Sequence, residues 1–156
     1  MRSEASELIG DCLILCGAIA LFVSLFLPWS HLLSPSESGS VLAPGVPRDP
    51  TAWQAYSVID VGLALVALAL LMIALLAGLR WRLGVLVPVG LALAFTIHAL
   101  SVPPTSGANV LDPAASVPRY VPVFASAGSG ETVAIAALGA AVAGVVLSLT
   151  AEIRRA

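Results

Sequence analysis

Four side chains that could bind a metal or carry protons lie near the ends of apolar segments: Asp60, His98, Glu131 and His31. An uncharged run from Val61 to Leu79 follows the first of them directly. Imidazole and carboxylate groups are ligands that first-row metals accept, and a histidine–carboxylate pair can relay protons. One functional interpretation is therefore a metal or proton site that these groups share.

Structural pairing is the other interpretation of Asp60, and the sequence favours it. A charged side chain in a membrane helix is costly unless water or a partner compensates it. A helix start near residues 49–51 would place Asp60 one or two turns later, close to water and to the positive helix end. Its partner would then be Arg48, Arg119 or His98. Neither an H-x-x-H nor an H-E-x-x-H pair fixes two ligands on one helix face, so we predict no metal.

Glu131 has a structural interpretation of the same kind. It falls in the first turn of an expected helix, behind Ser129, where a capping residue would stand. The chain contains no Walker A, G-x-S-x-G, dinucleotide-binding or zincin motif, and no nucleophile–base pair can be assigned. We therefore predict no enzyme activity, no catalytic residue and no cofactor.

Composition indicates the environment that must position these residues. Of the 156 residues, 59% are hydrophobic and only 10% are charged, which is more apolar surface than a soluble domain of this size can hide. The lipid bilayer is thus an expected partner. A net charge of −2 without a basic run argues against nucleic-acid binding.

The apolar residues fall into four runs of about twenty residues, each about 30 Å long as a helix. We predict an all-α integral membrane protein, a single four-helix bundle over residues 1–156. The expected helices cover about 8–28, 53–79, 83–102 and 131–151. The two long connections, about 29–52 and 103–130, are rich in Pro, Ser and Gly and lack the alternation of strands, so we predict irregular extracytoplasmic loops that cap the bundle.

Arginine placement predicts the orientation. Five of the seven basic residues fall on one side of a four-span arrangement, namely Arg2, Arg80, Arg82, Arg154 and Arg155. Only Arg48 and Arg119 fall on the other side. The positive-inside rule then places both termini in the cytoplasm, where Asp11 and Glu152 can pair with those arginines. The bias towards Arg, Ala, Gly and Val suggests a bacterial source, and hence the cytoplasmic membrane.

Small residues at four-residue spacing mark two helices. Close backbone approach along such stripes packs helices in lipid, so they predict seams within the bundle or between protomers. The stripes are Cys12, Cys16, Ala20 and Ser24, and Ala136, Ala140, Gly144 and Ser148. The spacing of the two cysteines does not match a redox or zinc motif, and we expect buried thiols.

The two outer loops resemble each other. Residues 38–50 can be laid on residues 106–122 with small gaps, and both contain the tripeptide Val-Pro-Arg. Either an internal duplication of a helix-loop-helix unit or shared compositional bias explains the match. A duplication would make two pairs of charged residues equivalent: Arg48 with Arg119, and Asp60 with Glu131.

Two short motifs carry a resemblance in the first half of the chain. Leu27-Pro28-Trp29 and Trp53-Gln-Ala-Tyr56-Ser-Val-Ile-Asp60 resemble uncharacterised small four-span membrane proteins of high-GC Gram-positive, actinobacterial-type bacteria. That resemblance implies a bacterial cell-membrane protein and no particular activity. The layout is also similar to claudin-like four-span proteins, but their paired loop cysteines and strand pattern are missing, so no function is carried over.

Together these patterns predict a non-enzymatic accessory or interaction protein. It would bind a protein partner or another copy of itself through the small-residue seams and the outer loop cap. The alternative is a small transporter or ion-conducting oligomer that uses Asp60 and His98.

Overall fold

Apolar helices dominate the computed structural model, which describes residues 2–33, 41–42, 46–56, 58–76, 79–105, 109–112, 119–122 and 124–153. The helices in chain order are α1 (Arg2–Ser24), α2 (Ala52–Ala55), α3 (Ile59–Leu76), α4 (Leu79–Ser101) and α5 (Ser129–Ile153). Among these described residues, four helices are long and apolar enough to cross a membrane: α1, α3, α4 and α5. These helices agree with the predicted membrane bundle.

Local sequence explains where the helices end. α1 ends at Ser24, ahead of Pro28, and α4 ends at Ser101, ahead of the proline pair at 103–104, because a residue before proline disfavours helical geometry. The predicted continuous helix over 53–79 is interrupted near its start. The chain turns extended at Tyr56, with φ −128° and ψ 135°, and separates the single turn of α2 from α3.

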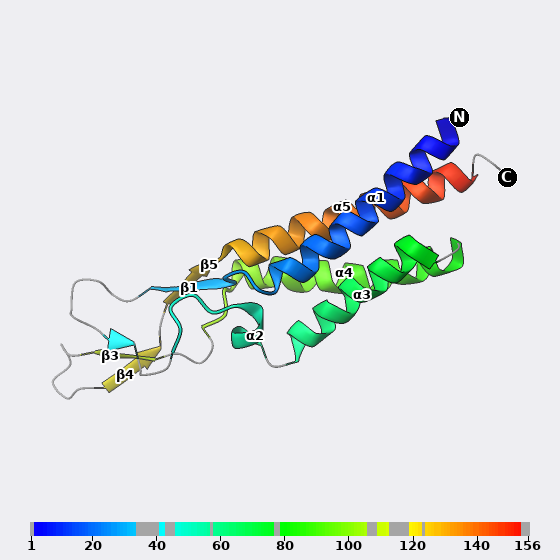
Figure 1. Cartoon of the computed structure of the whole chain (residues 1–156). Coiled ribbons are helices and arrows are strands. Elements are labelled where there is room, and N and C mark those ends of the chain that lie inside the picture. Colours follow the sequence, from blue (N-terminus) through cyan, green and yellow to red (C-terminus); the bar gives the residue numbers. More distant parts are fainter. Residues whose placement is uncertain are drawn as a thin grey trace.

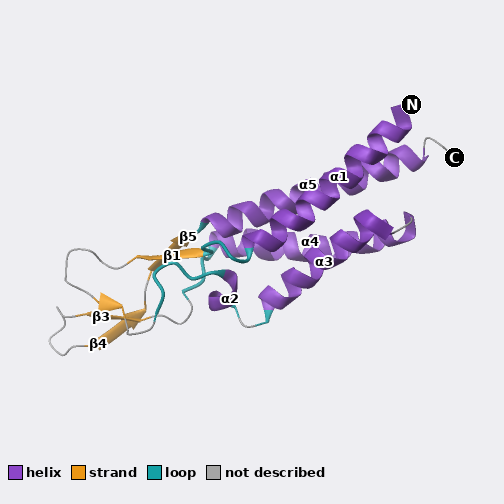
Figure 2. Cartoon of the chain, in the orientation of Figure 1, coloured by secondary structure: helices purple, strands orange, loops and turns teal. Residues whose placement is uncertain are grey.

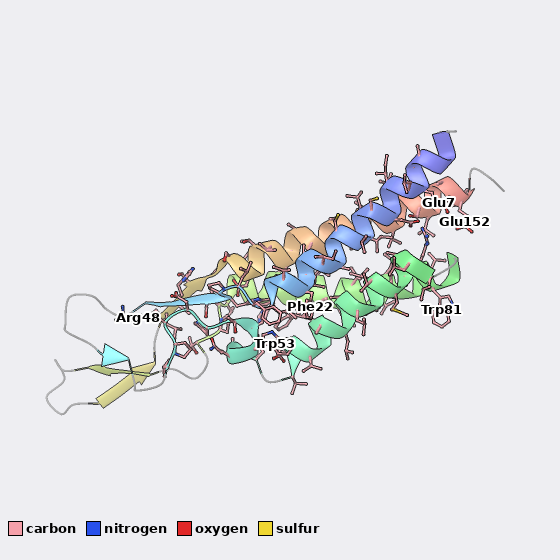
Figure 3. All side chains as sticks on the ribbon, viewed as in Figure 1. Glu7, Phe22, Arg48, Trp53, Trp81 and Glu152 are labelled. Carbon is pink, nitrogen blue, oxygen red and sulfur yellow. The ribbon has the colours of Figure 1, made fainter. Side chains whose placement is uncertain are left out.

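The two ends of the bundle differ in character. Both chain termini lie at one end, the termini end, and all the strands lie at the other, the strand end (Figure 1). Labelled side chains follow the same division: Glu7, Trp81 and Glu152 lie towards the termini end, and Arg48 lies at the strand end (Figure 3).

Helices α1 and α5 pack most closely, as an antiparallel pair (Figure 1). A side chain on Gly17 would bring its Cβ to 2.6 Å from the carbonyl oxygen of Ala137, and one on Gly144 to 2.5 Å from that of Gly10. Glycine is therefore required for this backbone approach, which is how helices associate in lipid. α3 packs on α1, α4 packs on α5, and α3 and α4 touch each other less.

As a seam within the bundle, the predicted small-residue stripes are only partly in place; as a seam between protomers they stay a prediction. Ser24, Gly144 and Ser148 are buried, whereas Ala20 and Ala140 are half-buried. The remaining three, Cys12, Cys16 and Ala136, are exposed, so the expectation of buried thiols is wrong.

Helix periodicity explains the error. The true contact face of α1 contains Gly10, Ile14 and Gly17, and a shift of two residues rotates a side chain by about 200° around a helix. On α5 a strict four-residue stripe drifts by about 40° at each step, so it leaves the contact face within two steps.

A polar network closes the termini end. Arg82 of α4 lies 2.9 Å from Asp11 of α1, and the same carboxylate oxygen accepts a hydrogen bond of 3.4 Å from Ser148 of α5. Arg82 is only 8% exposed. The predicted pairing of Asp11 with an arginine is thus observed, and it joins three helices.

The prediction of irregular outer loops is wrong, because both contain strands (Figure 2). β1 (Ser30–Leu33) pairs antiparallel with β5 (Phe124–Ala127), in register Ser30↔Ala127. A second sheet has the order β2 (Val41–Leu42), β3 (Asn109–Asp112) and β4 (Arg119–Pro122). These strands are too short to show a clear two-residue alternation, and each finds its partner in a distant part of the chain.

The two aligned loops meet in this second sheet. Val41 pairs with Leu111, and Leu42 pairs with Val110. The Val-Leu dipeptides that match in the sequence alignment therefore pair with each other in antiparallel register, as a local two-fold axis would require. Most of the other aligned residues lie outside the described part of the chain.

Candidate functional site

Trp29 is the centre of the strand end. It is fully buried, and its indole Nε1 donates a 2.8 Å hydrogen bond to the carbonyl oxygen of Ser24. Its backbone N–H donates to Pro50, and its backbone oxygen accepts from Gly128 at 3.0 Å. This single residue joins the end of α1 to both loops.

Two glycines make room for this junction. A side chain on Gly128 would collide with the backbone of Pro28, and one on Gly130 would collide with the indole ring of Trp29. Both backbone N–H groups are also occupied, because Gly130 donates to Pro28 at 2.7 Å. The segment before α5 is thus specialised for close packing.

A row of aromatic rings continues from Trp29 into the bundle. The Trp29 and Tyr56 ring centroids are 5.9 Å apart with an interplanar angle of 85°, and Tyr56 and Phe95 are 5.3 Å apart at 74°. These are edge-to-face contacts, the arrangement that the ring quadrupoles favour. The row connects the end of α1, the α2–α3 linker and α4.

Glu131 lies beside this row, in the first turn of α5. Its side chain is fully buried, and neither carboxylate oxygen has a hydrogen-bond partner among the described residues. The predicted first-turn position of Glu131 is therefore observed, whereas a capping hydrogen bond to its carboxylate is not found within the described residues. A buried polar group without a partner costs about 1–3 kcal/mol, and among the described residues the two carboxylate oxygens of Glu131 are the buried side-chain atoms of this kind.

The ionisation of Tyr56 depends on this carboxylate. Burial raises the pKa of the Tyr56 phenol to about 12, and the negative charge of Glu131 acts in the same direction. The phenol therefore stays neutral well above its ordinary range, and the two side chains form an electrostatically coupled pair.

Asp60 is the second buried carboxylate at the strand end. It is 3% exposed and occupies the first turn of α3, where its Oδ1 accepts a 2.8 Å hydrogen bond from the N–H of Val61. Asp60 therefore caps its own helix instead of lying one or two turns inside a continuous one. Like Glu131, Asp60 lies in the first turn of its helix, although of the two only Glu131 lacks a hydrogen-bond partner among the described residues.

The other members of the predicted polar cluster do not join these carboxylates. His31 bonds through Nδ1 to Asp49 at 2.6 Å, and the side chains of Arg48 and His98 are exposed. The side chain of Arg119 lies outside the described residues. Within the described part of the chain, no group of three His, Cys, Asp or Glu residues could hold a metal ion.

Sequence reasoning missed the aromatic row of Trp29, Tyr56 and Phe95, and the coupling of Tyr56 with Glu131. The Pro-Trp after α1 and the Gly-Ser-Gly before α5 were visible signals of a special junction. Nothing in the linear pattern indicated that one packs on the other. Comparison of the chain with protein-family models, curated proteins and solved structures finds no match.

Proposed function

We propose that this protein is an integral membrane accessory protein of the bacterial cytoplasmic membrane, with no enzymatic activity of its own. The strand end faces outwards, the termini end faces the cytoplasm, and the strands provide a surface for a protein partner or a second copy. The orientation follows from the excess of arginines at the termini end.

The observation that carries the proposal is the layer of strands built jointly by the two loops. β1 continues from α1 and β5 leads into α5, so the closest helix pair of the bundle extends into a β ladder. Trp29 ties this ladder to the bundle at its base. A preformed surface outside the bilayer is what a partner-binding protein needs, and Phe124 on β5 is 78% exposed there.

The distribution of buried polar groups favours binding over transport. Ser24, Ser30, Asp60, Thr96 and Glu131 lie towards the strand end, and Arg82 and Ser148 lie towards the termini end. The described core between them consists of residues such as Ala67, Leu70, Val89 and Leu138. A path for ions through one copy would need polar groups across this middle section.

Native purification tests the proposal. The protein is extracted from its own cells in mild detergent, and co-purifying proteins and oligomeric state are determined for wild type, Phe124→Ser and Val58→Ser. Val58 is a matched control, since it is 76% exposed in the α2–α3 linker. We expect Phe124→Ser to weaken a complex that Val58→Ser retains, with equal thermal stability. A wild-type protein recovered as a bare monomer would contradict the proposal.

Glu131 favours a second candidate function, a small proton- or cation-dependent transporter. Here the buried carboxylates Glu131 and Asp60 would carry the ion, in place of the originally predicted pair of Asp60 and His98. Vesicles loaded with a pH-sensitive dye test this function. If Glu131→Gln abolishes a flux that the exposed-site variant His98→Ala leaves intact, transport becomes the better explanation.

A further inference from the structure

An apolar groove of about 440 Å³ lies between α1 and α3 and reaches towards the strand end. Its lining includes Phe22 from α1, Trp53 from α2 and Leu65 and Leu68 from α3. Phe22 and Trp53 lie close together in the region between the two helices (Figure 3). The groove is separate from the Trp29–Glu131 junction, none of whose residues lines it.

The groove has a floor of short side chains and walls of long ones. Ala18 and Ala67 on the floor are only 2% and 3% exposed. Phe22, Leu65 and Leu68 on the walls are 48–60% exposed. The contrast in side-chain length produces a slot that runs along the helices.

Trp53 closes the slot at the strand end. Its ring packs against Phe26 with the centroids 6.0 Å apart, which holds the indole in place although 39% of the residue is exposed. An indole combines an apolar body with a polar N–H and is typical of the level where lipid headgroups begin. Trp53 therefore marks the depth at which the slot reaches the membrane interface.

The length of the slot corresponds to one leaflet. Its lining on α3 runs from Val61 to Leu71, which is about 15 Å at 1.5 Å per residue. That is half of a hydrocarbon core of about 30 Å. A slot that begins at the interface and ends near the midplane matches one hydrocarbon chain of one leaflet.

The long side chains of the groove walls favour a lipid chain over a partner helix as the occupant of the groove. Helices in lipid associate along small residues that allow close backbone contact, as Gly10, Gly17 and Gly144 do in the α1–α5 seam. In the groove, by contrast, the long side chains of Phe22 and Leu65 stand on either side of the small floor residues. These side chains would hold a helix backbone away from the floor. A flexible hydrocarbon chain can enter such a slot and contact both walls.

We propose that the α1–α3 groove binds one acyl chain of a membrane phospholipid from the strand-end leaflet. The chain lies along Ala18 and Ala67, and Trp53 lies next to its glycerol end. This site depends only on the four helices crossing a bilayer, and it stands whether the protein is an accessory protein or a transporter.

Lipid retention tests the site. Full-length protein is reconstituted in vesicles of phosphatidylethanolamine and phosphatidylglycerol, extracted in mild detergent, and examined by native mass spectrometry. Ala64→Phe places a large ring in the groove, and Ala94→Phe places the same ring on an exposed position of α4 outside it. We expect wild type and Ala94→Phe to retain one tightly bound phospholipid. Ala64→Phe should lose it with a roughly tenfold drop in affinity, or about 1.4 kcal/mol.

A second pair of variants keeps the proposal testable if Ala64→Phe fails to fold. Leu65→Ala and Leu68→Ala lower the exposed walls without inserting bulk, and each should weaken lipid retention at unchanged thermal stability. Equal retention by wild type and all groove variants would overturn the proposal. A disulfide between two copies of Leu65→Cys, in a background without Cys12 and Cys16, would also overturn it, because a second copy would then occupy the groove.

Discussion

At the residue scale, Glu131 and Asp60 show how the same side-chain chemistry takes two forms at equivalent positions. Asp60 bonds to the N–H of Val61 in its own helix, whereas Glu131 is fully buried and has no partner among the described residues. Trp29 packs on Gly130, the residue directly before Glu131 at the start of α5. Burial of a carboxylate without a partner costs free energy, and Glu131 is therefore a candidate for a functional role.

Replacing Glu131 by an apolar side chain of similar length should stabilise the protein. We expect Glu131→Met to raise the free energy of unfolding by about 1–3 kcal/mol, because the buried polar atoms without partners are removed. Thermal unfolding in detergent micelles measures the change. Glu152→Met, at an exposed position of α5, should change little. If Glu131→Met destabilises the protein, a donor outside the described residues compensates the carboxylate.

The raised pKa of Tyr56 predicts that the protein loses stability at alkaline pH. The pKa of Tyr56 is raised from 10.0 to about 12 in the folded protein, chiefly by burial and further by Glu131. Because the folded-state pKa is the higher one, the stability contributed by the neutral phenol is complete below about pH 10 and is lost as the pH rises through about 12. Tyr56→Phe should therefore lose less stability than wild type across that range.

Ultraviolet absorbance of tyrosinate, followed as the pH rises, tests whether burial and Glu131 raise the pKa of Tyr56. The chain has two tyrosines, and the difference between wild type and Tyr56→Phe isolates the signal of Tyr56. Glu131→Gln should lower the pKa of Tyr56 but leave it above 10.0, since burial remains. A transition of Tyr56 near 10.0 in the folded wild type would contradict this description of the site.

At the element scale, α1 and α5 form the most closely packed helix pair of the bundle, and α3 and α4 pack on each other much less. Gly10, Gly17 and Gly144 bring the two backbones of the α1–α5 pair together. α3 touches α4 little and borders the groove on its other side. The closest backbone packing is thus found between α1 and α5, whereas the groove lies between α1 and α3.

The seam can be tested with two glycines on one helix. A Cβ on Gly144 would lie 2.5 Å from the oxygen of Gly10, whereas a Cβ on Gly139 would meet nothing within 4 Å. We expect Gly144→Leu to destabilise the protein by about 1–3 kcal/mol through overpacking, and Gly139→Leu to have little effect or a small gain. Equal unfolding temperatures for the two variants would contradict the observed seam.

The Asp11–Arg82 pair should contribute through mutual compensation. Arg82 is the more buried partner, so Asp11→Leu, which leaves it unpaired, should cost about 3 kcal/mol, the lower end for a buried pair because Asp11 is 30% exposed. The double variant Asp11→Leu/Arg82→Met should recover much of that loss. A strictly additive loss in thermal unfolding would show that the two charges do not interact.

At the scale of the whole molecule, the two ends of the bundle carry different structures. The strand end has two small sheets and the enclosed Glu131, and the termini end has both chain ends and the Asp11–Arg82–Ser148 network (Figure 1). This polarity follows from chain topology, because four antiparallel crossings return the C-terminus to the side of the N-terminus.

Cysteine labelling tests the proposed orientation. In a background without Cys12 and Cys16, Arg48→Cys at the strand end should react with a membrane-impermeant maleimide in intact cells. Glu152→Cys at the termini end should react only after permeabilisation. Both positions are exposed, so accessibility on the protein does not limit either reaction. The reversed pattern would show that the strand end faces the cytoplasm.

The sequence by itself determined the four long helices, because uninterrupted apolar runs of about twenty residues have few alternatives in lipid. It also determined the pairing of Asp11 with an arginine, since depth along each helix follows from residue number alone. The first-turn position of Glu131 was likewise visible in the sequence.

Only the tertiary structure decided which way each helix is rotated and what its ends meet. Rotation placed Gly10 and Gly17, rather than Cys12 and Cys16, on the α5 seam. Pairing between distant loops made strands of segments with no clear alternation, and Trp29 came to pack on Gly130 at the start of α5. Each of these depends on contacts between residues far apart in the chain, which local periodicity and propensity do not encode.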